Sequence, residues 1–352
     1  MAAAPLSSRS NIGRHATGAH AATDPPGRAH GIALTYPAPV PALPPTLSIH
    51  IANYAATDPR DWTPLLDRAR SADAAGVDRL VVSDHVVFGE RLEQYGRPEV
   101  GGIDGGKQPT GPDGLWLEPL TLLSVLAGTT THARLGTGIL LAALRRPVVL
   151  AKAAATLDVL SGGRLDLGVG VGWQREEYEA AGLDFGDRGR LLDHTLAVCQ
   201  TLWRDQTARF DGEGLHFEAI HCMPKPVQPG GVPIWVSGRL NDRVIERIVR
   251  FGSGWIPWGD VARNPAEGLS RVRDALAAAG RDPAGFQVEG PLPVVRDRDG
   301  AIDIPPTMER VPALVAAGIT DFRAPVRIPD DPTAAADLLG PIVAAFRSAV
   351  GR

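Results

Sequence analysis

The chain has 352 residues, of which 44% are apolar and 22% charged, and its formal net charge of −4 corresponds to a pI near 6.1. This composition predicts a folded protein with a sizeable core and excludes an intrinsically disordered chain. The mild negative charge argues against a nucleic-acid-binding surface, because such a surface must neutralise many phosphates. The expected partner is therefore a small molecule.

Residues 1–45 are rich in Ala, Pro and small polar residues. Such a segment buries little apolar surface, so we expect a disordered or loosely packed extension before a single domain at 46–352. The extension lacks the continuous apolar stretch of a signal peptide, and no run in the chain has membrane-spanning length. Cys199 and Cys222 show neither CxxC spacing nor the density of a disulfide scaffold. Together these features favour a cytoplasmic protein that does not bind a membrane.

From residue 46 onward, short β-branched or apolar runs alternate with helical patterns, which is typical of parallel βα units. The expected strands span 47–53, 79–83, 134–140, 165–169, 233–237, 254–258, 286–295 and 319–324. The expected helices span 61–75, 118–130, 147–160, 187–204, 241–251, 265–279, 307–317 and 332–350. Eight such pairs predict an α/β protein with a (β/α)8 TIM barrel, although doubly wound sheets use the same unit.

Reactive groups of such barrels lie at the carboxyl ends of the strands and in the loops that follow them. Long loops at 84–117, 170–186 and 205–232 are therefore expected to cover a large ligand. Asp84 and His85 emerge where the second strand ends. A histidine there could exchange protons near neutral pH or be structural, while Asp84 could face the ligand or anchor a loop.

Glycines mark the ends of the next two strands. Gly136 and Gly138 lie inside the third strand, where a bare backbone allows either close approach of a flat ligand or tight packing. After the fourth strand, Gly170 and Gly172 precede a polar segment that contains Glu176. The GxGxxG spacing is absent, which argues against pyrophosphate binding of the Rossmann kind.

The fifth strand ends in Ser237, Gly238 and Arg239, directly before a helix. A hydroxyl, free backbone N–H groups, a cation and a helix N-terminus together form either a phosphate cradle or an ordinary helix cap with a surface arginine. The histidines form no HxH or HExxH pattern, and there is no GxSxG nucleophile elbow. We therefore expect no metal site.

Ordered segments across about residues 46–258 resemble the bacterial luciferase-like monooxygenase family, most closely its actinobacterial coenzyme F420-dependent oxidoreductase branch. The segments are SDHVVF, LEPLTLLSVLAGTTTHARLGTGIL, RRPVVLAKAAATLDVLSGGRLDLGVGVGWQREEYEAAG, PKPVQPGGVPIWVSG and FGSGWIPWG. The resemblance implies a cofactor that lies across the barrel mouth, with its ring near the ends of the second to fourth strands.

The same resemblance implies roles for individual residues. His85 matches a proton donor, base or ring contact, and it is the expected catalytic residue. The peptide between Gly138 and Ile139 matches a non-prolyl cis bond. The expected cofactor contacts are Asp84, Gly138, Ile139, Gly170, Val171, Glu176, Ser237 and Gly238, with the last two in the phosphate-binding turn.

Two positions depart from the sugar-phosphate dehydrogenases of this family. Trp173 stands where those enzymes carry a carboxylic acid, and their aromatic residue shortly after the histidine is replaced near Gly89. Sugar-phosphate oxidation is therefore not expected. Trp173 and Trp258 are instead expected to line a pocket for an apolar substrate, while Trp116 and Trp255 could join them or serve as barrel packing.

The leading hypothesis is hydride transfer between F420 and an apolar small organic substrate, with His85 exchanging the matching proton. The alternative is an FMN-dependent two-component monooxygenase that uses O2 and receives reduced flavin from a separate reductase. A cofactor-binding protein without turnover and a metal hydrolase on the same fold are further alternatives, because a fold does not fix a function. The resemblance also implies a homodimer.

Overall fold

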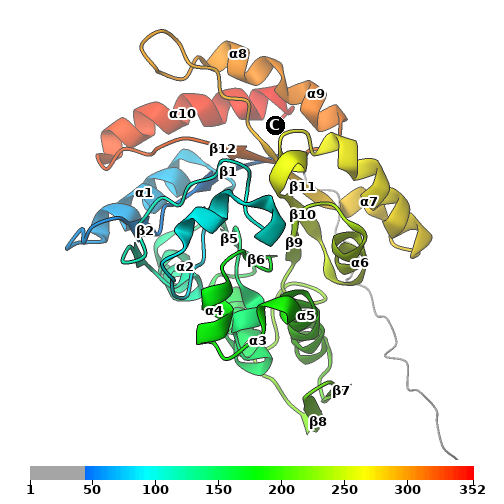
Figure 1. Ribbon diagram of the computed structural model, residues 1–352. Helices are drawn as coiled ribbons and strands as arrows, with labels where there is room; N and C mark the ends of the chain where they lie inside the picture. Colours follow the sequence, from blue (N-terminus) through cyan, green and yellow to red (C-terminus); the bar gives the residue numbers. More distant parts are fainter. Residues whose placement is uncertain (1–43) are drawn as a thin grey trace, which may run out of the picture. The chain divides into compact units, whose positions relative to one another are not determined.

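The computed structural model describes residues 44–352, and in this part of the chain eight parallel strands close into a barrel (Figure 1). Each strand pairs with the next barrel strand along the chain, and the last pairs with the first. The barrel strands are β1 Thr46–His50, β3 Arg79–Val82, β5 Arg134–Thr137, β6 Leu165–Val169, β9 Ile234–Gly238, β10 Gly254–Pro257, β11 Gln287–Pro291 and β12 Asp321–Ala324. Every predicted strand overlaps one of them, which confirms the TIM barrel. Nearly all of the expected N-terminal extension lies outside the described residues.

Helices surround the barrel (Figure 1). They are α1 Thr63–Ala75, α2 Pro119–Thr129, α3 Pro147–Leu160, α4 Arg175–Ala180, α5 Arg188–Arg204, α6 Asp242–Phe251, α7 Ala266–Ala278, α8 Ile304–Glu309, α9 Val311–Ala316 and α10 Pro332–Ala349. The helix predicted at 307–317 is wrong as a single element, because α8 and α9 meet at Arg310. Pro312 has no N–H to continue the helix from α8. The short helix α4 was not predicted.

Local signals explain where several helices begin and end. Gly76 has a φ of 87° and ends α1, as its position in the sequence predicts. The carboxylate of Glu118 accepts a hydrogen bond from the Thr121 N–H at the start of α2. The side chain of Asn241 does the same for Val244 at the start of α6. These caps fix the helix ends next to the barrel mouth.

Two small sheets interrupt connections that were predicted to be loops. β2 Tyr54–Ala55 pairs antiparallel with β4 Leu115–Trp116, which ties down the long connection after β3. β7 Ala208–Gly212 and β8 Leu215–Ile220 form a hairpin between α5 and β9. A connection from a helix to the next strand lies at the amino end of the barrel.

The barrel interior contains a buried group of charges. Asp166 accepts hydrogen bonds from Arg79 and Arg134, and Arg79 also pairs with Asp321. Burial acts to raise the pKa of Asp166, but the two guanidinium groups hold this pKa below its usual value. Because each charge has an opposite partner, the group can remain inside the barrel.

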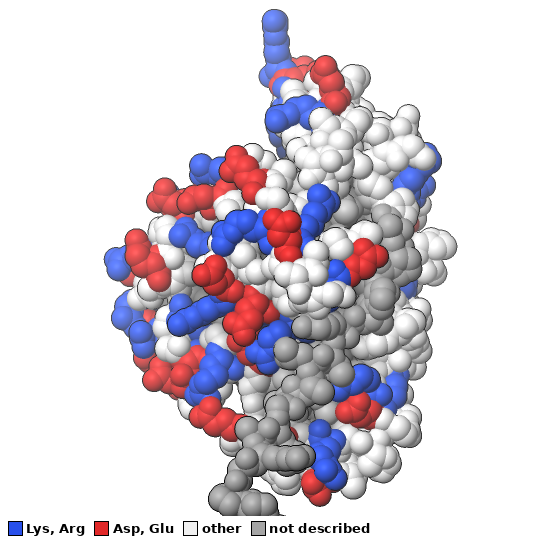
Figure 2. Space-filling view, turned by 90° about the vertical axis from the view of Figure 1, so that its right-hand side faces the viewer, with Lys and Arg blue, Asp and Glu red and all other residues white. Residues whose placement is uncertain are grey.

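The surface mixes both signs of charge. On the face that Figure 2 shows, basic and acidic side chains are interspersed and form no continuous basic area. Among residues 44–352, no helix combines the length and the apolar character needed to cross a bilayer.

Gly168 in β6 is packed so closely that any side chain would collide. A Cβ at this position would lie 1.9 Å from the carbonyl oxygen of Thr137, which belongs to the backbone and cannot rotate away. Gly168→Ala is expected to destabilise the fold by about 2–3 kcal/mol, as overpacking does in barrel cores. Denaturant unfolding would measure this loss.

Gly128 in α2 is a matched control, because a Cβ there meets nothing within 4 Å. Gly128→Ala should raise the free energy of unfolding by about 0.5–1 kcal/mol, since alanine is the better helix former. A Gly168→Ala variant as stable as the parent would contradict the packing described for β6.

Candidate active site

A cavity of about 730 Å³ opens at the carboxyl ends of the barrel strands. This is the end at which TIM barrels carry their active sites, and the volume fits a ligand of cofactor size, for which roughly 300–1,000 Å³ is usual. The connections at 84–117 and 170–186 contribute lining residues, as predicted. The connection at 205–232 contributes none. Its predicted role as a cover is wrong, because it lies at the opposite end of the barrel.

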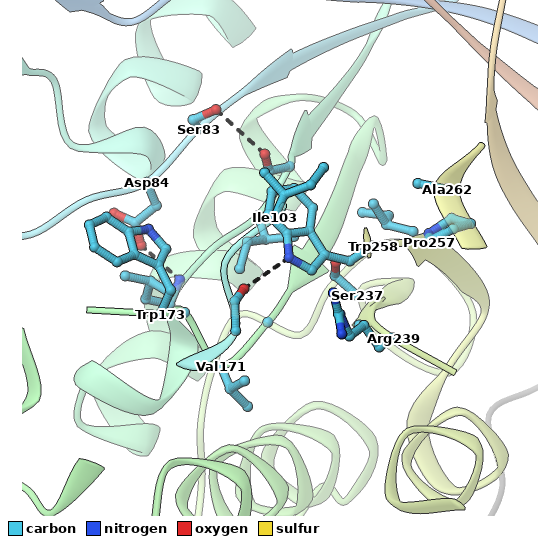
Figure 3. A pocket seen from close by; sticks show the side chains of 18 of the residues that line it. Ser83, Asp84, Ile103, Val171, Trp173, Ser237, Arg239, Pro257, Trp258 and Ala262 are labelled. Atoms are coloured by element: carbon cyan, nitrogen blue, oxygen red, sulfur yellow. Dashed lines mark hydrogen bonds between the residues drawn. The ribbon is translucent and has the colours of Figure 1, made fainter. Parts of the chain in front are cut away.

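The cavity brings together all but one of the residues that the sequence assigned to the site. The lining includes Asp84, His85, Gly138, Ile139, Gly170, Val171, Trp173, Ser237, Gly238 and Trp258. Figure 3 shows Asp84 and Trp173 on one side of the cavity, with Ser237, Arg239 and Trp258 on the other. These residues come from distant parts of the chain, so only the closed barrel places them together.

Glu176 is the exception, since it does not line the cavity. One of its carboxylate oxygens accepts a hydrogen bond from Arg91 at 2.5 Å. Its neighbour Glu177 does not line the cavity either, but α4 turns that side chain toward His85, which it contacts directly. We therefore replace Glu176 with Glu177 in the candidate site. Without α4 in the predicted elements, the sequence could not separate these two adjacent acids.

His85 is held on several sides. Its Nδ1 lies 3.2 Å from Oε2 of Glu177, and only 10% of its side chain is exposed. The rings of Phe88, Trp116 and Trp173 surround the imidazole, with centroids 4.4, 4.9 and 5.8 Å away. This packing fixes the plane of the ring and leaves its remaining edge directed into the cavity.

Asp84 is an anchor. Its fully buried carboxylate accepts hydrogen bonds from the Leu141 N–H at 2.8 Å and from Nη1 of Arg145 at 2.6 Å. The second oxygen accepts from Nη2 of Arg145 at 3.1 Å. Both oxygens are already engaged, which favours the loop-anchoring role over direct cofactor contact. Asp84 thereby fixes the segment after β5 against the end of β3.

The segment after β5 presents backbone to the cavity. The peptide between Gly138 and Ile139 is cis, as the family resemblance implies. A Cβ on Gly170 would lie 2.3 Å from Cδ1 of Ile139, and one on Gly172 would lie 2.7 Å from a methyl group of Leu141. Glycine at 170 and 172 therefore lets the Ile139 and Leu141 side chains occupy this wall.

The turn after β9 forms a cationic corner. Asn241 caps α6, so the helix-cap interpretation of this turn is correct, but Arg239 lines the cavity and is not simply a surface residue. Arg188, at the start of α5, also lines the cavity. Among the described residues, the Nε atoms of Arg188 and Arg239 are buried without a hydrogen-bond acceptor. Buried guanidinium donors at a cavity wall can bind an anionic group of a ligand.

The floor of the cavity is polar, which the sequence did not predict. Arg323 donates to Glu289 and, through Nε at 3.0 Å, to Ser48. Burial raises the pKa of Glu289. Burial and the nearby Arg323 lower the pKa of His50 to about 4, so this imidazole is neutral where its Nε2 contacts Ser83 at 2.9 Å. A substrate that reaches this floor meets hydrogen-bonding groups in addition to apolar walls.

Aromatic side chains cover the cavity. Tyr95 packs between Trp173 and Trp258, with centroid distances of 5.4 and 6.1 Å. The indole N–H of Trp258 donates to the Gly101 carbonyl at 2.9 Å, which ties the connection after β3 to the end of β10. Trp116 also lines the cavity, whereas Trp255 is fully buried. Of the two tryptophans left open by the sequence, one belongs to the site and the other to the barrel packing.

A cavity of this composition at the mouth of a TIM barrel defines a barrel enzyme with a cofactor-sized site. Residues 46–301 match the model of the luciferase-like monooxygenase family. The chain therefore belongs to that family, whose members are flavin- or F420-dependent oxidoreductases and monooxygenases. Within the described residues, no three His, Cys, Asp or Glu side chains gather as metal ligands.

Several known proteins are similar to the chain in sequence or in fold. An uncharacterized protein of Mycobacterium tuberculosis is 34% identical over 221 residues, which are 62% of this chain and 73% of that protein. The oxygenase component of a flavin-dependent trigonelline monooxygenase from Acinetobacter baylyi is 36% identical over 123 residues, 34% of each chain. An F420-dependent secondary alcohol dehydrogenase, solved with an F420–acetone adduct, superposes with a TM-score of 0.65 at 16% identity, covering 87% of this chain and 100% of that chain. The last likeness shows a shared fold.

Proposed function

We propose that this protein binds coenzyme F420 and transfers a hydride between it and a small, largely apolar organic substrate. One observation carries the proposal: a single cavity is lined by His85, by the backbone surface at Gly138 and Ile139, and by the cationic corner with Arg188 and Arg239. A proton carrier, a flat surface and an anion site are what a deazaflavin with a phosphate-bearing tail requires.

The residues present fit such a group. Glycine at 170 keeps the wall beside Ile139 flat, because a side chain there would displace the Ile139 methyl group. The buried Nε donors of Arg188 and Arg239 lack acceptors, which an anionic tail would supply. More than one guanidinium at this corner favours F420 over FMN, since the F420 tail carries carboxylates beyond its phosphate.

Each part of the site has a task in the proposed reaction. A bound deazaflavin supplies the two-electron hydride chemistry. His85 holds or accepts the proton that accompanies the hydride, and Tyr95 with its tryptophan neighbours excludes water. Ser237 and Gly238 would hold the phosphate through the hydroxyl and backbone N–H groups at the start of α6.

The second candidate function is that of an FMN-dependent oxygenase component served by a separate reductase. The relative from Acinetobacter baylyi, which bears such a name, favours it. The same cavity would hold the ring of either cofactor, so the discriminating property is the affinity for each.

Arg239→Met is expected to weaken F420 binding at least tenfold, because hydrogen bonds to charged groups contribute about 1.5–3 kcal/mol. A fluorescence titration of the parent and the variant, with F420 and with FMN in both redox states, measures this. Arg243→Met is the control. Arg243 is an exposed residue of α6, the helix that follows the turn with Arg239, and it does not line the cavity. Equal loss in both variants would place the tail elsewhere, and preference of the parent for reduced FMN would favour the oxygenase.

We also propose a cytoplasmic homodimer whose domain spans residues 46–352. The helices α2 and α3 pack against each other and expose apolar side chains. These side chains support contact with the second subunit at the surface formed by the two helices. They are Val125, Val148, Val149, Val159 and Leu160. Burial of such side chains at a subunit interface would remove apolar surface from water.

A further inference from the structure

We infer that Glu177 is a positioning residue that sets the tautomer of His85, so that the nitrogen facing the cavity is an unprotonated Nε2. The role of this nitrogen as a proton acceptor in catalysis rests on the proposed function. The tautomer itself follows from contacts within the chain and needs no cofactor.

Both oxygens of Glu177 are committed. The carboxylate is fully buried, with Oε1 accepting from the Val86 N–H at 2.9 Å and Oε2 lying 3.2 Å from Nδ1 of His85. A carboxylate accepts hydrogen bonds only. A proton shared between the two groups therefore resides on Nδ1.

The opposite edge of the ring agrees with this assignment. Nε2 of Gln108 lies 3.5 Å from Nε2 of His85, at the outer limit of a hydrogen bond, and an amide NH2 group can only donate. The aromatic neighbours Phe88 and Trp116 prevent the imidazole from turning over. Nδ1 thus stays on the side of Glu177 and Nε2 stays toward the cavity.

In this tautomer the unprotonated Nε2 of His85 can accept a proton from a substrate. If F420 is bound, it would supply the acceptor for the hydride that leaves the C–H bond of a substrate alcohol. The hydroxyl proton moves to Nε2 of His85 and a C=O bond forms. The resulting imidazolium lies beside the Glu177 carboxylate, which stabilises its charge. For carbonyl reduction the same imidazolium returns the proton.

Glu177→Gln should invert the tautomer while keeping the shape of the side chain. The Val86 N–H is an obligatory donor, so it takes the single amide oxygen of the glutamine. The amide NH2 then faces Nδ1 of His85, which must become the acceptor, and the proton moves to Nε2. Glu176→Gln is the matched control, because Glu176 is the adjacent acid but pairs with Arg91 and not with His85.

The test is long-range ¹H–¹⁵N NMR on the full chain without cofactor, where protonated and unprotonated imidazole nitrogens have well separated shifts. The His85 signals are those that vanish in His85→Asn. We expect Nδ1 protonated in the parent and in Glu176→Gln, and Nε2 protonated in Glu177→Gln. The rate at which diethyl pyrocarbonate modifies His85, followed by mass spectrometry, should fall at least tenfold in Glu177→Gln alone.

A parent protein with the proton on Nε2 would overturn the inference, and this result needs no folded variant. An unchanged tautomer and modification rate in a folded Glu177→Gln would overturn it as well. Failure of the proposed function has a different signature. In that case the tautomer shifts as expected, yet neither F420 binding nor an effect of His85 on turnover is found.

Discussion

Replacement of His85 by alanine should lower turnover by about 10²–10⁴-fold, the range that a positioned general acid or base contributes. The reason is that His85 is the imidazole whose free edge enters the cavity, beside the surface formed by Gly138 and Ile139. The affinity for F420 should change only a few-fold, because the cationic corner with Arg239 stays intact. A screen of alcohols and ketones first identifies a substrate. Turnover is then measured from the absorbance change of bound F420 in a single turnover, and the affinity for F420 is measured by fluorescence titration.

His132→Ala is the control for this experiment, since His132 is exposed and lies outside the cavity. It should leave both turnover and affinity unchanged. Full activity in His85→Ala would remove His85 from the proton transfer. Loss of cofactor binding in the same variant would instead indicate that the imidazole serves chiefly as a ring contact.

Asp84→Ala should lower the free energy of unfolding by about 3 kcal/mol, near the lower end of the cost of breaking a buried ion pair. The fully buried carboxylate of Asp84 pairs with Arg145, whose side chain is only 17% exposed, and it also accepts from the Leu141 N–H. The lower end applies because Arg145 keeps a second carboxylate partner in Glu118. Guanidinium chloride unfolding followed by tryptophan fluorescence and circular dichroism measures the change.

Asp330→Asn is the matched control, because Asp330 pairs with Arg68 but remains 66% exposed. Exposed pairs contribute about 0–1 kcal/mol, so this variant should be nearly neutral. If Asp84→Ala were equally neutral, Asp84 would not anchor the segment after β5. Its assignment as a direct cofactor contact would then be the better explanation.

Much of the fold follows from local pattern. The alternation of apolar strands with helices that end at glycines such as Gly76 is visible along the chain and predicts the barrel. Errors arise where a short segment is decided by its surroundings. α4 has only six residues, and β2 pairs with a strand that begins 61 positions later in the sequence. Such short elements form only because the folded barrel holds them.

The amino-acid sequence contains enough information to predict the strand and helix order, the family resemblance and the position of His85 at a strand end. It could not determine which of two adjacent acids reaches that histidine, that Asp84 is already engaged by Arg145, or that Arg323 and Glu289 form the floor of the cavity. The hydrophobic periodicity of a sequence indicates which face of its own helix or strand a residue occupies. Contacts between residues far apart in the chain arise only when the barrel closes, so the tertiary structure alone decided them.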